Sequence, residues 1–466
     1  MGSAVGRRWV AVFACAVAAA GFVPGVAGAQ PPPEEEGMAV PPPLPDGFAI
    51  PSDDGQPDQD YVRETPCISS LPSTKPIEHK PWGQDRLRFT ELATFANGEG
   101  QKVAVIDTGV SNHTHFGGRL EGGGDYVARG GDGLEDCDGH GTAVAGIIAA
   151  DPADESIGFR GIAPAARIVS IRQTSTNYQF TDAQGKSRGA GSLTTLTKAI
   201  IRAADTPDVT VINMSVNNCR PASVGPIRDE ERELQAALRY AVKDKDIVVV
   251  ASAGNVGEGN CPSQNGPDPR NPIQIVFPPW FADDVLSVAA MTETGEPAEF
   301  SIQGPWVSVA APGTDIVSLD PANPDQLVNR TYDKERKEAP IQGTSFAAPY
   351  VAGLAALVRD RFEDLDARQV MHRIKATAAH PAAAGGRDNV VGHGMIDPIA
   401  ALTAFIPDEE GLPRDEPMSI PFEMPAPYER DWGPALVAII GTAGGVGLLL
   451  VTLFVVHTVR RNRRSA

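Results

Sequence analysis

Four polar residues stand beside glycines or other small residues along the chain, in the order Asp107, His140, Asn255 and Ser345. A serine hydroxyl attacks an amide only when a base takes its proton, and an imidazole oriented by a carboxylate is such a base. An asparagine amide and the serine backbone N–H can hold the oxyanion that forms. Each motif alone is more often a turn, a helix cap or a loop residue. Their conjunction predicts a proton relay in which Ser345 attacks, His140 is the base and Asp107 orients it.

Apolar runs typical of buried strands alternate with segments of helical spacing. This pattern predicts an α/β fold with a mostly parallel central sheet and helices on both faces. The strands are expected at residues 103–106, 166–171, 209–212 and 247–250, and the helices at 142–150, 193–204 and 230–242. Parallel sheets place active sites at the carboxyl ends of their strands, where Asp107 and Asn255 are expected. The polar segment 172–192 is predicted to be a surface loop.

Longer motifs surround these residues, at 103–109, 140–146, 211–215, 251–255 and 343–353, with weaker echoes at 309–313 and 392–397. On these motifs, residues 86 to 405 resemble the subtilisin family of serine proteases. The resemblance implies a three-layer subtilisin-like fold and an acyl-enzyme mechanism. It also implies that Asp107, His140 and Ser345 form the catalytic triad, in the chain order of that family, and that Asn255 contributes to the oxyanion hole.

The same resemblance implies that a peptide substrate pairs as an extended strand along Ser215, Val216 and Asn217. Many subtilisins carry two glycines after this serine and its hydrophobic neighbour, whereas Asn217 and Asn218 stand here. The bulkier side chains predict a narrower cleft. We therefore expect cleavage of a restricted range of proteins rather than general degradation.

The segment that follows Asp107 departs from the family in a way that concerns metal binding. Many subtilisins carry His-Pro-Asp there, with an acid that ligates calcium, whereas this chain has His113, Thr114 and His115. Calcium prefers oxygen ligands, so we expect this calcium site to be missing and no metal or other cofactor to be required. No further Cys or His stands nearby in the sequence for zinc, so both histidines are predicted to be solvated loop residues.

The first 29 residues have the layout of a secretory signal peptide, with Arg7 and Arg8 before an apolar stretch and a small-x-small site at 27–29. The alternative, an uncleaved membrane anchor, is disfavoured because glycines and a proline interrupt the apolar stretch. Residues 30–85 are rich in Pro, Asp and Glu, which predicts an extended arm before a peptidase domain at 86–406.

The C-terminal end has the features of a membrane anchor. Residues 435–456 carry no charge, and as a helix they would span about 33 Å, so a transmembrane helix is expected at 434–457. The acidic, Pro-rich segment 407–433 is interpreted as a linker, which argues against the alternative of a buried core helix. Arginines gather in the tail, 458–466, so the tail is expected in the cytoplasm and the bulk of the chain outside.

Five cysteines are too few for a disulfide-built miniprotein, and none forms a CxxC pair. Cys15 falls in the signal, which leaves four cysteines in an oxidising compartment, where disulfides are expected. Three pairings are possible and the sequence alone does not choose among them. Of these we favour Cys67–Cys137 and Cys219–Cys261.

The net charge of −19 argues against a nucleic-acid partner, which would need a basic surface. The layout from signal to C-terminal membrane helix resembles the mycosins, membrane-anchored subtilases of type VII secretion systems. The resemblance implies an arm wrapped around the catalytic domain and association with the secretion membrane complex. The predicted function is an extracytoplasmic serine endopeptidase of the cell membrane that acts on protein or peptide substrates. The alternative is a structural subunit of that complex, favoured by the membrane helix and a GxxxG at Gly441 and Gly445.

Overall fold

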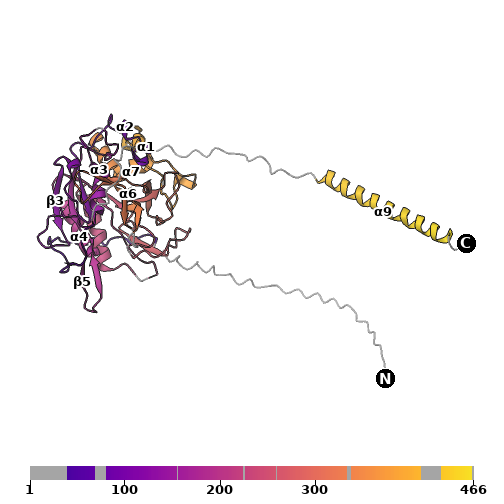
Figure 1. Ribbon diagram of the computed structural model, residues 1–466, viewed down its shortest axis with the longest axis horizontal. Helices are drawn as coiled ribbons and strands as arrows, with labels where there is room; N and C mark the ends of the chain where they lie inside the picture. Colours follow the sequence, from indigo (N-terminus) through magenta and orange to yellow (C-terminus); the bar gives the residue numbers. More distant parts are fainter. Residues whose placement is uncertain are drawn as a thin grey trace, which may run out of the picture. The chain divides into compact units, whose positions relative to one another are not determined.

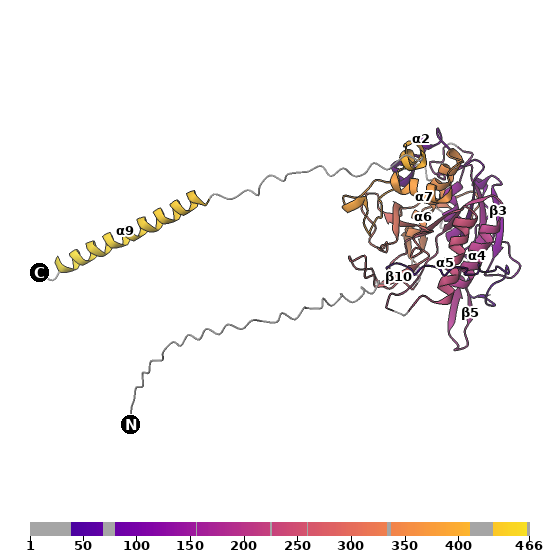
Figure 2. The same ribbon diagram turned by 180° about the vertical axis from the view of Figure 1, so that it is seen from behind.

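A computed structural model describes residues 39–68, 80–154, 156–223, 226–258, 260–332, 337–410 and 432–463. The chain forms two compact units, Met1–Glu409 and Glu410–Ala466. The predicted signal peptide, 1–29, and most of the predicted linker, 407–433, lie outside the described residues. Figures 1 and 2 show the first unit from opposite sides.

A seven-stranded parallel sheet forms the centre of the first unit (Figure 1). From one edge to the other, its strands are β12 (Val307–Pro312), β11 (Leu286–Met291), β9 (Val248–Ser252), β7 (Val209–Met214), β2 (Lys102–Asp107), β4 (Arg167–Arg172) and β3 (Leu120–Asp125). Strands β9, β11 and β12, which are rich in Val and Ala, are buried at every residue, as in a parallel sheet covered on both faces. The chain moves to β4 on one side of β2 and to β7 on the other, so a crevice opens at the carboxyl ends of β2 and β7.

Helices cover both faces of this sheet (Figure 2). Helix α3 (His140–Ala149) packs with α6 (Thr344–Arg361) on one face, and α4 (Leu193–Asp205) packs with α5 (Asp229–Arg239) on the other. The other helices described in this unit are α1 (Trp82–Arg86), α2 (Phe89–Leu92), α7 (Ala367–Ala376) and α8 (Pro398–Thr403). They are accompanied by the short 3₁₀ helices η1 (Thr114–Phe116), η3 (Ala384–Gly386) and η4 (Pro407–Glu410) and by the π-helix η2 (Tyr240–Asp244), which continues α5. This three-layer arrangement confirms the predicted fold class.

Local side-chain chemistry sets where two of these helices begin. Ser192 accepts the backbone N–H of Thr195, and the Thr195 hydroxyl accepts the backbone N–H of Ser192, so α4 begins at Leu193. Asp366 and Gln369 form the same reciprocal pair before α7. Each pair satisfies backbone donors that have no partner within the first turn of a helix.

The segment 172–192 is a β-hairpin, so the prediction of a surface loop was wrong. Strand β5 (Ser175–Thr181) pairs antiparallel with β6 (Ser187–Ala190), and the hairpin projects at the lower edge of the unit in Figure 1. Strand β1 (Val62–Arg63), from the predicted arm, extends this small sheet by pairing with β5. Because β5 is half-exposed along most of its length, its sequence lacks the apolar alternation that marks a strand against a core.

Three further antiparallel pairs complete the described strands. They are β8 (Asn218–Pro221) with β10 (Gln274–Phe277), β13 (Ser318–Leu319) with β14 (Leu327–Val328), and β15 (Arg330–Tyr332) with β16 (Glu338–Pro340). Strand β8 directly follows the predicted substrate-pairing segment, so its pairing with β10 holds the end of that segment in place.

The first described part of the predicted arm, residues 39–68, runs along the first unit and is fastened to it by carboxylates. Asp53 accepts hydrogen bonds from the Tyr126 hydroxyl and from Arg202 Nε, both at 2.8 Å. Asp58 accepts one from the Ser192 hydroxyl at 2.7 Å. The arm is thus tied to β3 and α4, and the acidic composition of this segment supplies the ties.

The second unit is described through one helix, α9 (Gly433–Arg463). Within it, Gly433–Arg461 is long and apolar enough to cross a membrane. The helix includes the predicted span 434–457 and continues into the predicted tail.

Replacing Asp53 tests the fastening of the arm. In Asp53→Ala, the Tyr126 hydroxyl and Arg202 lose a largely buried acceptor, which should lower the free energy of unfolding by about 1–3 kcal/mol. Thermal unfolding and the rate of limited proteolysis within residues 39–68 measure the change. Asp46→Ala, which removes an exposed carboxylate of the same arm, is the control. Equal melting temperatures and cleavage rates for the two variants would contradict this account.

Candidate active site

The structure places Asp107 and His140 in direct contact. Asp107 ends β2 and is fully buried, whereas the His140 side chain, at the start of α3, remains 30% exposed. His140 Nδ1 lies 2.6 Å from Asp107 Oδ1. This is the contact expected of a carboxylate that orients an imidazole and stabilises its protonated form.

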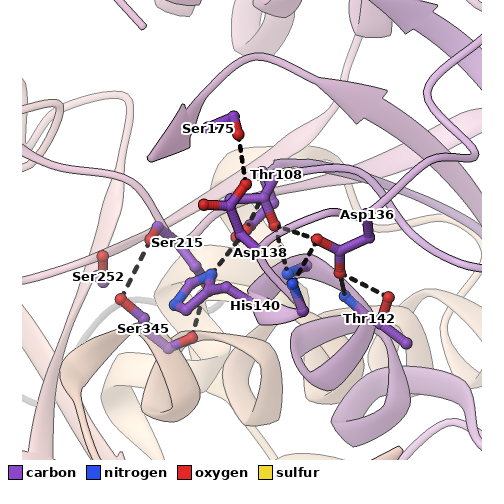
Figure 3. Close-up of polar contacts among 12 residues, drawn as sticks. Thr108, Asp136, Asp138, His140, Thr142, Ser175, Ser215, Ser252 and Ser345 are labelled. Carbon is purple, nitrogen blue, oxygen red and sulfur yellow. Dashed lines mark hydrogen bonds and ion pairs between the residues drawn. The ribbon is translucent and has the colours of Figure 1, made fainter. Parts of the chain in front are cut away.

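The buried carboxylate of Asp136 holds the start of α3 in place (Figure 3). Its Oδ1 accepts the Gly139 N–H and the Thr108 hydroxyl, both at 2.8 Å, and its Oδ2 accepts the Thr142 N–H at 2.8 Å. The Thr108 oxygen in turn accepts the Gly141 N–H at 2.9 Å. The first N–H groups of α3 are therefore bound by residues next to Asp107, which sets the distance between carboxylate and imidazole.

Asp136 and Thr108 were not among the predicted site residues. The available signal was an acid a few residues before a predicted helix, where side chains commonly accept free N–H groups. Close packing adds a further requirement at Gly141. A Cβ at this position would lie 2.0 Å from the Gly109 carbonyl oxygen, so only glycine lets α3 approach the end of β2.

Ser345 occupies the second position of α6, and a proline sets the hydrogen bonds of its backbone. Pro349 lies four residues later in the same helix and has no N–H to give to the Ser345 carbonyl. The Ser215 hydroxyl donates to that carbonyl instead, at 2.7 Å. The helix that carries the predicted nucleophile is thereby fastened to the end of β7.

The Ser345 hydroxyl lies beside His140 (Figure 3) and donates to the Ser215 carbonyl at 3.1 Å. Within the described residues it makes this hydrogen bond rather than one to the imidazole. A turn about the Cα–Cβ bond moves a serine hydroxyl between staggered positions without moving the backbone. We therefore expect a rotation of the Ser345 side chain to bring its hydroxyl to His140.

Both the oxygen and the nitrogen of the Asn255 side-chain amide are hydrogen-bonded. Its Oδ1 accepts the Thr344 N–H at 3.0 Å and the Thr344 hydroxyl at 2.9 Å, and its Nδ2 donates to Glu258 at 2.9 Å. Gly343, which precedes Thr344, has a positive φ, and a Cβ on Gly343 would lie 3.3 Å from Asn255 Nδ2. The predicted oxyanion donor therefore sits beside the start of α6, with its amide orientation set by Thr344.

The predicted substrate-pairing residues Ser215, Val216 and Asn217 line the same cleft as Asp107, His140, Asn255 and Ser345. The Asn217 side chain is engaged on both polar atoms: Nδ2 donates to the Ser252 carbonyl at 2.6 Å, and Oδ1 accepts the Ser252 hydroxyl at 2.8 Å. Asn217 thus joins this segment to the end of β9. The effect of Asn217 and Asn218 on the width of the cleft stays a prediction.

Ile68, from the arm, also lines the cleft, which encloses about 740 Å³. Its N–H donates to the Cys137 carbonyl at 2.9 Å, and the neighbouring Cys67 forms a disulfide with Cys137. The second disulfide joins Cys219, in β8, to Cys261, which follows Asn255 by six residues. Both bonds follow the favoured pairing, and both brace a wall of the cleft.

His113 and His115 are buried, so the prediction that they are solvated was wrong. His113 Nε2 lies 3.0 Å from the Gln326 carbonyl, and His113 Nδ1 accepts the His115 N–H at 3.2 Å. Burial lowers the pKa of His113 to about 4 and also lowers the pKa of His115. The two rings serve as neutral packing groups under the loop before β14, a long-range contact that local sequence does not reveal.

The pKa of His140 reflects two opposing influences. Burial lowers it, but the charge of Asp107 and the hydrogen bond to Asp107, with smaller effects of Asp136 and Asp138, outweigh burial and raise it to about 9. Burial raises the pKa of the Asp136 carboxyl, while its hydrogen bonds with Thr142 and Thr108 oppose that rise. The surroundings therefore favour the protonated imidazole that forms when a serine gives up its proton.

A parallel α/β domain with a carboxylate–imidazole pair and a serine at a helix start, in the order Asp, His, Ser, has the layout of a serine peptidase. The chain belongs to the subtilase family, whose profile (Peptidase_S8) matches residues 98–394. It is 42% identical over 422 residues to Mycosin-1 of Mycobacterium tuberculosis (strain ATCC 25618 / H37Rv), covering 86% of this chain and 91% of that protein.

Two solved structures extend the comparison. One is the serine protease MycP1, described as an essential component of the type VII (ESX-1) secretion system, with a TM-score of 0.71, 41% identity, and 78% of this chain and 100% of that chain covered. The other is a chain of an intact ESX-5 inner membrane complex, with a TM-score of 0.72, 38% identity, and 90% and 100% covered. These relatives confirm a serine endopeptidase of the mycosin type.

The raised pKa of His140 predicts the pH dependence of activity. Only the neutral imidazole accepts the serine proton, so kcat/KM should fall as pH falls through the pKa of His140. Because that pKa is raised, the midpoint should lie above the ordinary histidine value of about 6.5. Asp107→Asn should move the midpoint down and reduce kcat. A wild-type profile that stays flat down to pH 4 would contradict this role of His140.

Asp136→Asn tests the positioning of α3. An amide offers one acceptor oxygen where the carboxylate offers two, so some donors at the start of α3 lose their partner. Since misplacement of a catalytic group by about 1 Å can cost about 100-fold, kcat/KM should fall roughly 10- to 100-fold. The pH midpoint should also move down, because the charge of Asp136 helps to raise the pKa of His140. The exposed Asp132→Asn, on the same loop, is the control; an equal effect there would refute the assignment.

Proposed function

We propose that this protein is a membrane-anchored, extracytoplasmic serine endopeptidase in which Asp107, His140 and Ser345 form the catalytic triad. The observation that carries the proposal is the 2.6 Å contact between Asp107 and His140, in one cleft with Ser345. The membership of the chain in the subtilase family supports the same assignment.

The mechanism follows from these positions. Ser345 Oγ rotates to His140, transfers its proton to Nε2 and attacks the scissile carbonyl. The oxyanion is held by the Asn255 amide and by the Ser345 N–H at the start of α6. His140 then protonates the leaving amine, and water, deprotonated by the same imidazole, releases the acyl group. Asp107 remains ionised and stabilises the imidazolium in each half of the cycle.

A restricted substrate range is part of the proposal. Ile68 narrows one side of the cleft and is fastened there by the Cys67–Cys137 disulfide. Asn217, where many subtilisins have glycine, is bound to Ser252 and cannot move away without breaking two hydrogen bonds. A substrate therefore has to fit a preformed cleft in an extended conformation.

Membrane attachment is assigned to α9. Its apolar stretch is long enough to span a bilayer, and Arg460, Arg461 and Arg463 gather at its C-terminal end. Such arginines usually remain on the cytoplasmic side, which supports a peptidase domain on the outer side. The signal-like sequence at 1–29 supports the same orientation.

Association with a type VII secretion membrane complex completes the proposal. It is supported by the similarity to a chain of the ESX-5 inner membrane complex, which covers 90% of this protein. The same similarity favours a second function as a structural subunit, since a chain seated in a complex contributes contacts whether or not it cleaves a substrate. The two functions are compatible, and a single variant separates them.

Ser345→Ala separates catalysis from scaffolding. The wild type should react with a serine-directed fluorophosphonate and cleave peptides, and the variant should do neither, because the nucleophile is absent. The exposed Ser156→Ala is the control and should behave as the wild type. In a deletion strain, rescue of secretion by Ser345→Ala would show that scaffolding suffices for that process. A folded wild-type protein that fails to react with the fluorophosphonate would refute the peptidase mechanism.

A further inference from the structure

Glu258 places a carboxylate next to the oxyanion donor. Its side chain lines the cleft, and its Oε2 accepts a hydrogen bond from Asn255 Nδ2 at 2.9 Å. Within the described part of the chain, this amide is the only hydrogen-bond donor to the Glu258 carboxylate, and no Lys or Arg pairs with it there. The position is unusual for an acid, because negative charge develops beside Asn255 during acyl transfer.

The orientation of Asn255 does not require this acid. Thr344 already binds Asn255 Oδ1 through both its N–H and its hydroxyl. Those two bonds direct the oxygen toward α6 and the nitrogen toward the cleft. A neutral residue at position 258 would leave that orientation in place, so a purely structural role does not explain the charge.

The backbone of Glu258 is hydrogen-bonded through both its N–H and its carbonyl group. The Glu258 N–H donates to the Asn255 carbonyl at 3.2 Å, and the Glu258 carbonyl accepts the Cys261 N–H at 2.7 Å. Cys261 is bonded to Cys219 in β8, which directly follows the predicted substrate-pairing segment. These backbone contacts hold Glu258 beside Asn255, the proposed oxyanion donor.

Other acids that line the cleft are already occupied. Asp138 accepts hydrogen bonds from the Ser175 and Thr176 hydroxyls and from the Thr176 N–H. Asp320 accepts the N–H groups of two residues that follow it. Glu258 therefore has the most capacity to bind a further partner, and a cation is the complementary one.

We infer that Glu258 is a specificity-determining residue that selects peptides with a Lys or Arg side chain beside the scissile carbonyl. With a neutral peptide, the carboxylate repels the developing oxyanion and slows acylation. With a cationic side chain, an ion pair offsets that repulsion in the transition state, so the gain appears in the acylation rate. This inference rests on the proposed function, because it needs Ser345 as nucleophile and Asn255 as oxyanion donor.

The test uses probes that report acylation of Ser345 without a known natural substrate. Two diphenyl phosphonates differ only in the side chain beside phosphorus, aminobutyl as in lysine or butyl as in norleucine. Ser345 Oγ bonds to phosphorus, phenoxide leaves, and the phosphoryl oxygen occupies the oxyanion site. The wild type should react about three- to fivefold faster with the aminobutyl probe, a ratio suited to an ion pair at an exposed site.

Glu258→Gln removes the charge and keeps an acceptor for Asn255 Nδ2. It should react with both probes at rates within about twofold, and faster than the wild type with the butyl probe, since repulsion is gone. Glu258→Lys should favour an acidic probe, carrying a carboxypropyl side chain, over the aminobutyl one. The exposed Glu293→Gln should keep the wild-type ratio and is the matched control.

A fluorophosphonate, which carries no charged side chain, distinguishes a failure of the proposed function from a failure of the role of Glu258. If the folded wild type does not react with it, the proposed function fails. If it does react, but the two phosphonates label at equal rates or not at all, the role of Glu258 is refuted. An unchanged ratio in Glu258→Gln would refute it as well.

Discussion

The first turn of α3 is bound to the end of β2 through Asp136 and Thr108, and the geometry of the active site depends on this contact. A helix begins with backbone N–H groups that have no partner in the helix, and here a buried carboxylate and a hydroxyl accept three of them. Burying a carboxylate is costly, and the cost is offset only because its oxygens are fully surrounded by donors. Any shift of α3 would break these hydrogen bonds and leave buried polar groups without partners. The free-energy cost of that loss holds His140 against Asp107.

The charged residues of the cleft affect the imidazole and the oxyanion site differently. Asp107, Asp136 and Asp138 surround the imidazole and favour its protonated state. The proposed oxyanion site, by contrast, consists of neutral donors and borders the carboxylate of Glu258. In the proposed mechanism, the protein itself therefore supports proton acceptance by His140, whereas stabilisation of the oxyanion depends in part on the charge of the substrate.

The sequence predicted those parts of the structure that local motifs specify. Asp107 after an apolar strand and Ser345 before an apolar helix were identifiable because strand, turn and helix signals are contiguous in the chain. The hydrogen bond from the Ser215 hydroxyl to the Ser345 carbonyl was not identifiable. Pro349 leaves that carbonyl without a partner in the helix, and the donor that binds it lies 130 residues away in the sequence. Likewise, the burial of His113 depends on a loop more than two hundred residues later, with which its ring makes a hydrogen bond.

The strands of the hairpin at 172–192 were missed for a related physical reason. They lie against the arm rather than the core, so their side chains carry no apolar periodicity. The same arm supplies Ile68 to the cleft, a contribution that composition could not indicate. Sequence rich in acids and proline usually forms linkers, whereas part of this arm pairs with the hairpin and lines the cleft.

The bond between Cys67 and Cys137 has a practical consequence for handling the protein. A recombinant fragment that starts at residue 98, where the family profile begins, would retain Cys137 without its partner. That thiol stands three residues before His140 and, without Cys67, has no disulfide to protect it from oxidation. Loss of activity in such a preparation would then reflect adventitious thiol chemistry, and mass spectrometry under reducing and non-reducing conditions would distinguish it from a defect in the enzyme.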